Sequence, residues 1–387
     1  MTINKQIVLG ALETFSTLED VIKATKYTKK QLYNLGCRNK DVHTLLQTLT
    51  KTKKVSKKKP SREELKKEET INLHRFQSQM KDFAKDLPLL EEWKCKKKAG
   101  KNNEEWILLF SDLHYGQVVK PIEIGNFAEY NPKKAEERLM YLSKTIQHLT
   151  KYHTNPPETL NVFFLGDMID SVILRASQLA TTEFGLVKQI IGCIGLTAEF
   201  LVSLTGSFKH INCYGIGGNH SRITKSFADS TPQDNFDILI YEMVKQKVAN
   251  ISKIKIQYPE STHMIISIKN HNWWISHGDT MRGWMGLPFY GANREKSGIQ
   301  NLLNIFKEGV DYMAIGHFHQ DAYFNNIYMN GSFVGGDQYS VGRLRKMNIP
   351  EQTLIGVTEK FGVVWTRPIQ LEVRGKLLKP KIYGDGG

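Results

Sequence analysis

The sequence predicts an α/β fold, in which a small helical N-terminal domain precedes a large domain of alternating strands and helices. Five short apolar runs occur after residue 105, and helical patterns lie between them at 132–150, 184–205 and 235–248. Such runs separated by helices indicate either βαβ units or a layered α/β/β/α sandwich. An Asp, His or Asn also stands near the end of each run or within two residues after it, which a strand with a purely structural role does not require. The runs read WILLF, LNVFFLG, HINCYGIG, WWISHG and YMAIGHF.

The basic charge of the chain is concentrated in its N-terminal quarter. The formal net charge is +14 over 387 residues, and residues 1–103 carry +12 of it, from 24 Lys and Arg against 12 Asp and Glu. Residues 104–387 are close to neutral. The basicity therefore belongs to the N-terminal region and not to the protein as a whole.

Residues 1–50 predict short helices, two of which are joined by KYT in the manner of a helix-turn-helix. Thr17 and Thr28 stand where helix N-caps are expected, and Gly36 can end the second helix. The alternative is a small helical bundle that docks on a partner.

Residues 51–103 predict a basic linker followed by a charged helix. Six lysines and no acid lie between Lys51 and Lys59, and like charges in one block repel each other. A charged helical pattern begins at Pro60 and ends at Pro88. We expect residues 104–387 to form the catalytic domain.

Cysteine usage and hydropathy argue against several classes of protein. The four cysteines include no CxxC pair, which argues against a disulfide framework and a cysteine-built zinc site. The longest apolar run, at about residues 189–206, contains Glu199 and three glycines, so we expect a buried helix and no membrane partner. With no signal peptide pattern either, we expect a cytoplasmic protein.

The polar residues that end the five runs form an ordered set. Ligands of α/β sheets gather at the loops that leave one end of the strands, so residues about 200 positions apart can meet there. Imidazole and carboxylate suit borderline divalent ions such as Mn, Fe, Zn, Co or Ni. A set of this size indicates two ions that share a carboxylate and bind a phosphoryl group. Its members are Asp112, His114, Asp167, Asp170, Asn219, His220, His277, Asp279, His317 and His319.

The ordered motifs D-x-H, GD-x-x-D, GNH, HG and GH-x-H resemble those of the calcineurin-like metallophosphoesterases over roughly residues 106–335. The resemblance implies a four-layer α/β/β/α metallophosphoesterase sandwich with two divalent ions, for which we expect Mn. By motif, Asp112, His114 and His319 would hold one ion, Asn219, His277 and His317 the other, and Asp167 would bridge them. His220 would be the general acid or transition-state donor. Asp170 would orient His220 and raise its pKa, the alternative being that it caps the next segment.

The chain departs from the family pattern directly after GNH. Ser221 and Arg222 stand there, where repair nucleases and many protein phosphatases of the superfamily have an acid. The stretches GNHSR, HGDTMRG and GSFVGGDQYS look more like phage-encoded members, for which the location is the host cytoplasm. Arg222, Arg282 and Arg294 are candidate substrate contacts, because arginines interleaved with aromatic residues can pair with phosphates and stack on bases. The alternative is a surface loop that packs on the core.

Two functions fit these observations. The first is a DNA nuclease, in which a metal-bridging hydroxide attacks phosphorus and the basic N-terminal region binds DNA. The second is a phosphomonoesterase for a phosphoprotein or a nucleotide, whose N-terminal region docks a partner protein or forms a homodimer. A third interpretation, an assembly or DNA-binding protein with a vestigial metal centre, is disfavoured because a ligand type stands at every motif.

Overall fold

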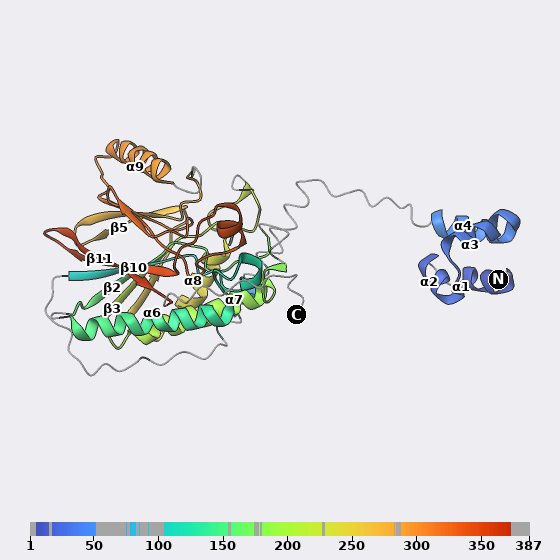
Figure 1. The fold of residues 1–387 in the computed structure, drawn as a ribbon, viewed down its shortest axis with the longest axis horizontal. Helices are drawn as coiled ribbons and strands as arrows, with labels where there is room; N and C mark the ends of the chain where they lie inside the picture. Colours follow the sequence, from blue (N-terminus) through green and yellow to red (C-terminus); the bar gives the residue numbers. More distant parts are fainter. Residues whose placement is uncertain are drawn as a thin grey trace, which may run out of the picture. The chain divides into compact units, whose positions relative to one another are not determined.

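A computed structural model gives the fold of the chain as two units, Met1–Phe76 and Gln77–Gly387 (Figure 1). The structure describes residues 5–14, 18–51, 75, 78–82, 85, 92, 104–153, 156–173, 178, 180–226, 229–281, 283 and 288–372.

The described part of the first unit contains the helices α1 (Lys5–Thr14), α2 (Leu18–Thr25), α3 (Lys29–Arg38) and α4 (Lys40–Lys51). Their apolar faces enclose a small core in which Val8, Val21 and Leu32 are fully buried. Amphipathic helices of this length depend on such packing for their stability.

The turn between α2 and α3 confirms the predicted cap. The Oγ1 of Thr28 accepts a hydrogen bond from the N–H of Gln31, and the Gln31 side chain accepts one from the N–H of Thr28. This reciprocal pair is a capping box, so Thr28 caps α3 as predicted. Lys26 has a φ of +55°, the left-handed conformation that glycine adopts most readily.

One predicted helix end is wrong, and parts of the N-terminal prediction fall outside the described residues. Helix α3 continues through Gly36 to Arg38, because Asn39 ends it and caps α4 through hydrogen bonds to the N–H groups of Asp41 and Val42. Thr17 and most of the predicted linker and charged helix lie outside the described residues. Those described between residues 75 and 85 are helical.

Two sheets form the centre of the second unit. The six-stranded sheet has the order β11-β10-β1-β2-β3-β4, with β1 to β4 parallel and with β10 and β11 antiparallel to their neighbours. Its strands are β1 (Glu104–Phe110), β2 (Thr159–Phe164), β3 (His210–Gly215), β4 (Ile254–Gln257), β10 (Glu351–Thr358) and β11 (Gly362–Gln370). The five-stranded sheet has the order β5-β6-β7-β9-β8. Its strands are β5 (His263–Ile268), β6 (His271–Ser276), β7 (Tyr312–Ile315), β8 (Ala322–Phe324) and β9 (Ile327–Met329).

Helices cover the outer faces of both sheets (Figure 1). Helices α6 (Pro132–Tyr152), α7 (Leu186–Leu204) and α8 (Phe236–Lys247) lie along the six-stranded sheet, and α9 (Phe289–Asn304) lies beyond the five-stranded one. The chain also forms a 3-10 turn, η2 (Pro121–Ile124), and a π-helical turn, η5 (Gln338–Arg343). The order helix, sheet, sheet, helix confirms the predicted four-layer sandwich.

The apolar core between the sheets explains the continuous run at β1. Successive side chains of a strand point to opposite faces. Ile107 and Leu109 therefore pack with Trp273 in the core between the sheets, whereas Phe110 packs against Phe200 of α7. Both faces of β1 are buried, so the strand contains no polar alternation.

Helix α7 is long and apolar enough to span a membrane by length and composition. Ile190, Ile194 and Leu201 are buried, and the helix packs between α6 and α8. It is therefore a core helix of the sandwich, as predicted for this apolar run.

Candidate metal centre

The loops that leave β1 and β2 lie side by side directly after the strands end. The N–H of Asp112 donates to the carbonyl of Gly166 at 3.1 Å, and the N–H of His114 donates to the carbonyl of Asp167 at 3.0 Å. The five-stranded sheet contributes to the same site, because the N–H of His317, which follows β7, lies 3.2 Å from both carboxylate oxygens of Asp112. Strand ends of both sheets therefore meet at one edge of the sandwich.

Five of the predicted ligands stand on left-handed backbone. Such φ values cost roughly 1–2 kcal/mol per residue for side chains other than glycine, and they cluster at functional sites. The φ values are +55° at Asp112, +43° at His114, +56° at Asp167, +67° at His317 and +53° at His319. The sharp turns that they produce direct these side chains toward one another.

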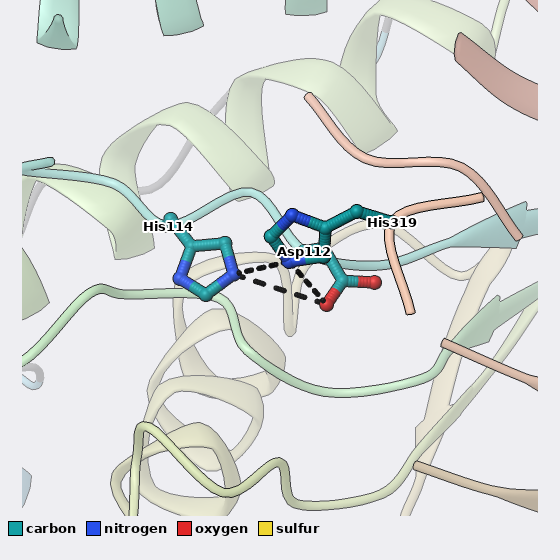
Figure 2. Close-up of side chains that lie close together, drawn as sticks. All are labelled: Asp112, His114 and His319. Carbon is teal, nitrogen blue, oxygen red and sulfur yellow. Dashed lines mark hydrogen bonds and ion pairs between the residues drawn. The ribbon is translucent and has the colours of Figure 1, made fainter. Parts of the chain in front are cut away.

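Asp112, His114 and His319 form the first donor cluster (Figure 2). The Nε2 of His319 lies 3.3 Å from Oδ1 of Asp112 and 3.0 Å from Nε2 of His114. Asp112 and His114 come from the loop after β1, and His319 from the loop after β7. Two imidazole nitrogens and a carboxylate oxygen thus face a common point.

Asn219, His277 and His317 form the second donor cluster together with Asp167. The Oδ1 of Asn219 lies 2.9 Å from Nε2 of His277 and 2.8 Å from Nδ1 of His317. The Oδ2 of Asp167 lies 3.2 Å from the same Nε2 of His277. The Nδ1 of His277 lies 2.7 Å from the carbonyl of Leu165, which can only accept a hydrogen bond. Nδ1 therefore carries a proton, and in the neutral ring Nε2 presents a lone pair to the cluster.

Asp167 lies between the two clusters. Its Oδ2 is 3.2 Å from Nε2 of His277 in the second cluster and 3.9 Å from Nε2 of His114 in the first. Lone pairs of imidazole, amide and carboxylate groups that face one another are stabilised by a cation between them. This mixed nitrogen and oxygen donor set fits two borderline divalent ions with Asp167 shared between them.

The pKa shifts of Asp167 and His317 favour the forms that bind metals, whereas the shift of His277 favours its protonated form. Although burial raises it, the neighbouring histidines lower the pKa of the Asp167 carboxyl well below its ordinary value. Burial and the neighbouring His277 lower the pKa of His317 to about 3. Although burial lowers it, the charge of Asp167 raises the pKa of His277 to about 9. Asp167 is thus ionised and His317 neutral at neutral pH, while metal binding would release a proton from His277.

His220 lies beside the clusters and is paired with Asp170. Its Nδ1 is 3.2 Å from Oδ1 of Asp170 and 3.0 Å from the carbonyl of the same residue. Although burial lowers it, the carboxylates of Asp167 and Asp170 raise the pKa of His220 to about 9. The same Oδ1 of Asp170 also lies 3.4 Å from Nδ1 of His114. Asp170 therefore contacts both a predicted ligand and the predicted proton donor.

A cavity of about 580 Å³ opens over the clusters, and His220, Asp167 and His319 line it. Two of the three predicted arginine contacts do not line it. Arg222 forms an ion pair with Asp279, and its side chain is 13% exposed. Arg294 is exposed on α9, and neither arginine lines the cavity. Arg282 lies outside the described residues.

Sequence reasoning missed Asp237, a fully buried carboxylate at the start of α8 that joins the loop of Asp167 to the loop of Asn219. Its oxygens accept hydrogen bonds from the N–H groups of Asp167 at 2.8 Å, Met168 at 3.1 Å and Gly218 at 2.9 Å. They also accept one from the hydroxyl of Ser221, the residue that replaces the acid after GNH. In the sequence, an acid in the first turn of a helix indicates only a favourable helix dipole contact.

Comparisons with known proteins give distant similarities. No protein-family model matches the chain. The SPbeta prophage-derived uncharacterized protein YonJ of Bacillus subtilis (strain 168) is 23% identical over 246 residues, which are 60% of this chain and 56% of that protein. The chain thus spans about half the length of this relative.

Two solved structures are also similar. Zinc-complexed Vps29 from Entamoeba histolytica is 12% identical with a TM-score of 0.28, over 69% of this chain and 99% of that one. A conserved uncharacterized protein described as a predicted phosphoesterase, from Streptococcus pneumoniae TIGR4, is 10% identical with a TM-score of 0.26, over 69% and 98%. The fold assignment rests on the topology and the site geometry given above.

The two-sheet sandwich, the order of the motifs and the donor clusters that meet at Asp167 agree with the resemblance read from the sequence. The fold is an α/β/β/α sandwich, and the donor residues meet in the arrangement that this resemblance implies. In this site the loops carry the donor atoms, and the strands fix where those loops begin.

The first prediction separates the metal ligands from the proton donor. In His220→Ala the donor clusters are intact, so we expect the metal content to be unchanged and turnover to fall about 10²–10⁴-fold. In His277→Ala we expect bound metal to be lost. Elemental analysis of the purified proteins and hydrolysis of a small phosphodiester measure both quantities. Loss of all metal from His220→Ala would show that His220 is a ligand.

The second prediction concerns Asp237. Replacement by Ala leaves three buried N–H groups without their acceptor and loosens the loops of Asp167 and Asn219. We expect Mn affinity in calorimetric titration to fall about 10–100-fold, as for other residues that orient metal ligands. Ser221→Ala is the matched control, because it removes only one of the four hydrogen bonds and should have a smaller effect. Equal Mn affinity in wild type and Asp237→Ala, both folded by circular dichroism, would contradict the assignment.

Proposed function

We propose that the protein is a metal-dependent phosphodiesterase that cleaves DNA. The observation that supports this proposal most strongly is the pair of donor clusters joined by Asp167 at a cavity of about 580 Å³. Two divalent ions bound there, with Mn expected, would activate a water and neutralise the oxygens of a phosphoryl group. Asp112, His114 and His319 would hold one, and Asn219, His277 and His317 the other.

His220 supplies the proton for the leaving oxygen in this proposal. The Asp170 carboxylate and carbonyl both lie at Nδ1 of His220, so the proton on Nε2 is the one that a substrate in the cavity can receive. The raised pKa of His220 keeps the ring protonated at neutral pH. Asp170 therefore fixes the orientation and the charge of the donor.

The N-terminal helices support the proposal that the substrate is DNA. Lys23, Lys26, Lys29 and Lys30 are exposed on and around the turn between α2 and α3. Lysines grouped on one helical pair can neutralise several phosphates, which gives an affinity that falls steeply with salt. We propose that these helices act as a helix-turn-helix on DNA and not as a docking site for a protein partner or a second copy.

The prophage-derived relative supports a phage-type member of the family. We accordingly propose that the protein works in the cytoplasm of the host cell.

The third prediction tests the reaction. Linear and circular DNA incubated with the protein and Mn should be cleaved, and chelation of the metal should abolish cleavage until Mn is added back. The p-nitrophenyl phosphate monoester serves as the comparison substrate. Fast hydrolysis of the monoester without any cleavage of DNA would replace the nuclease proposal with a phosphomonoesterase.

A separate measurement tests DNA binding with a fourfold Lys→Gln variant at residues 23, 26, 29 and 30. The slope of log DNA affinity against log salt concentration should become shallower by up to about 3.6 in this variant, since each phosphate contact contributes about 0.9. A matched control replaces four other exposed lysines, Lys144, Lys151, Lys188 and Lys360. Equal slopes in the two variants would contradict DNA binding by the N-terminal helices.

A further inference from the structure

Much of the cavity wall beyond the donor clusters is formed by one continuous segment, residues 335–348. The segment follows β9 and contains the π-helical turn η5. Its Asn348 side chain donates a hydrogen bond to the carbonyl of His319, which attaches the segment to a loop of the first cluster. The segment is therefore held next to the place where the proposed reaction occurs.

Lys346 supplies a positive charge to this wall. Among the described residues that line the cavity, it is the only lysine or arginine, whereas the carboxylates of Asp167, Asp170 and Asp337 all line it. The side chain is half-buried, and burial lowers the pKa of its amine. An ammonium group that has already lost part of its hydration is stabilised by a charge-assisted hydrogen bond to an anion.

The backbone of the segment is built to hold Lys346 in this place. Asp337 and Ser340 form a capping box at the start of η5, with hydrogen bonds of 2.7 and 2.9 Å. Arg345 then adopts a left-handed φ of +55°, and the N–H of Lys346 donates to the carbonyl of Ser340 at 2.9 Å. The chain thus folds back over the turn. Both π-helical turns and left-handed backbone at side chains other than glycine cluster at functional sites.

Tyr339 gives the same wall an aromatic surface. It lines the cavity and is 45% exposed. The guanidinium carbon of Arg343 lies 5.9 Å from the ring centroid. Sites for single-stranded nucleic acids combine exposed aromatic rings, which stack on bases, with basic groups that contact the phosphates. In this wall Lys346 is the basic group that lines the cavity.

We propose that residues 335–348 form a nucleotide-binding wall, in which Lys346 binds the phosphate of the nucleotide that is cleaved and Tyr339 stacks on the base of the same nucleotide. This inference rests on the proposed phosphodiesterase function and specifies the substrate as a nucleotide ester. A phosphoprotein has no base for Tyr339 to stack on. The wall also supplies the contacts that the sequence assigned to Arg222 and Arg294, neither of which lines the cavity.

The kinetic test uses thymidine 5′-(p-nitrophenyl phosphate) with Mn and the full-length chain. Lys346→Ala should raise KM about tenfold, the loss expected for one charge-assisted contact, and should leave kcat within about twofold. Lys346→Arg should restore most of the affinity because it keeps the charge. Lys144→Ala is the matched control, since Lys144 is exposed on α6 and does not line the cavity. It should have the KM of the wild type.

The base contact is tested by comparing the thymidine ester with methyl p-nitrophenyl phosphate, which carries no base. The ratio of kcat/KM for the two esters should fall about tenfold in Tyr339→Ala, in line with the loss of one stacking contact. Tyr339→Phe keeps the ring and should keep the ratio.

The outcomes for the wall and for the proposed function differ. Suppose that the wild type hydrolyses both esters, that KM is unchanged in Lys346→Ala and that the ester ratio is unchanged in Tyr339→Ala. This result overturns the proposed nucleotide-binding wall and leaves the proposed phosphodiesterase function intact. A wild type inert toward both esters overturns the proposed function. In that case the proposed nucleotide-binding wall is tested by measuring the affinity of the Mn-loaded proteins for thymidine 5′-monophosphate by calorimetry. A tenfold weaker affinity in Lys346→Ala supports it, and equal affinities overturn it.

Discussion

The position of the Asp167 carboxylate is the constraint on which the rest of the site depends. One oxygen lies 3.2 Å from His277 of the second sheet, and the other accepts the N–H of His220 at 2.8 Å. Its own N–H is held by Asp237. The residue thus connects both sheets, both donor clusters and His220, the proposed proton donor. A shift of this one carboxylate would change the geometry of every other group in the site.

The sandwich stabilises an arrangement that is unfavourable by itself. Five donor residues have left-handed backbone, and the Asp112 and Asp167 carboxylates lose nearly all of their hydration. Backbone strain of this kind persists only where the surrounding structure determines it, and buried charges persist only when they are paired. The two sheets fix the loop ends, and Asp237 ties the loops together. Divalent cations at the clusters would compensate the remaining negative charge.

The parts of the fold and site that could be predicted from the sequence are those with a local pattern. The run WILLF followed by Asp112 and His114 indicates both a buried strand and its functional end, and the same reasoning holds for the later strands. Asp237 lacked such a pattern, because its contacts with the loops of Asp167 and Gly218 form only after the chain folds. The place of Lys346 depends on a π-helical turn, for which the sequence has no clear signature. Arg222 was expected at the substrate, but the fold pairs it with Asp279.

The sharing of Asp167 by two ions can be measured by calorimetric titration of Mn into metal-free protein. We expect two ions per chain for the wild type. For Asp167→Asn we expect weaker binding at both sites, because the lost charge belongs to both. A single ion bound to the wild type would show that the two clusters do not hold separate ions. One ion bound to Asp167→Asn with wild-type affinity would show that Asp167 is not shared.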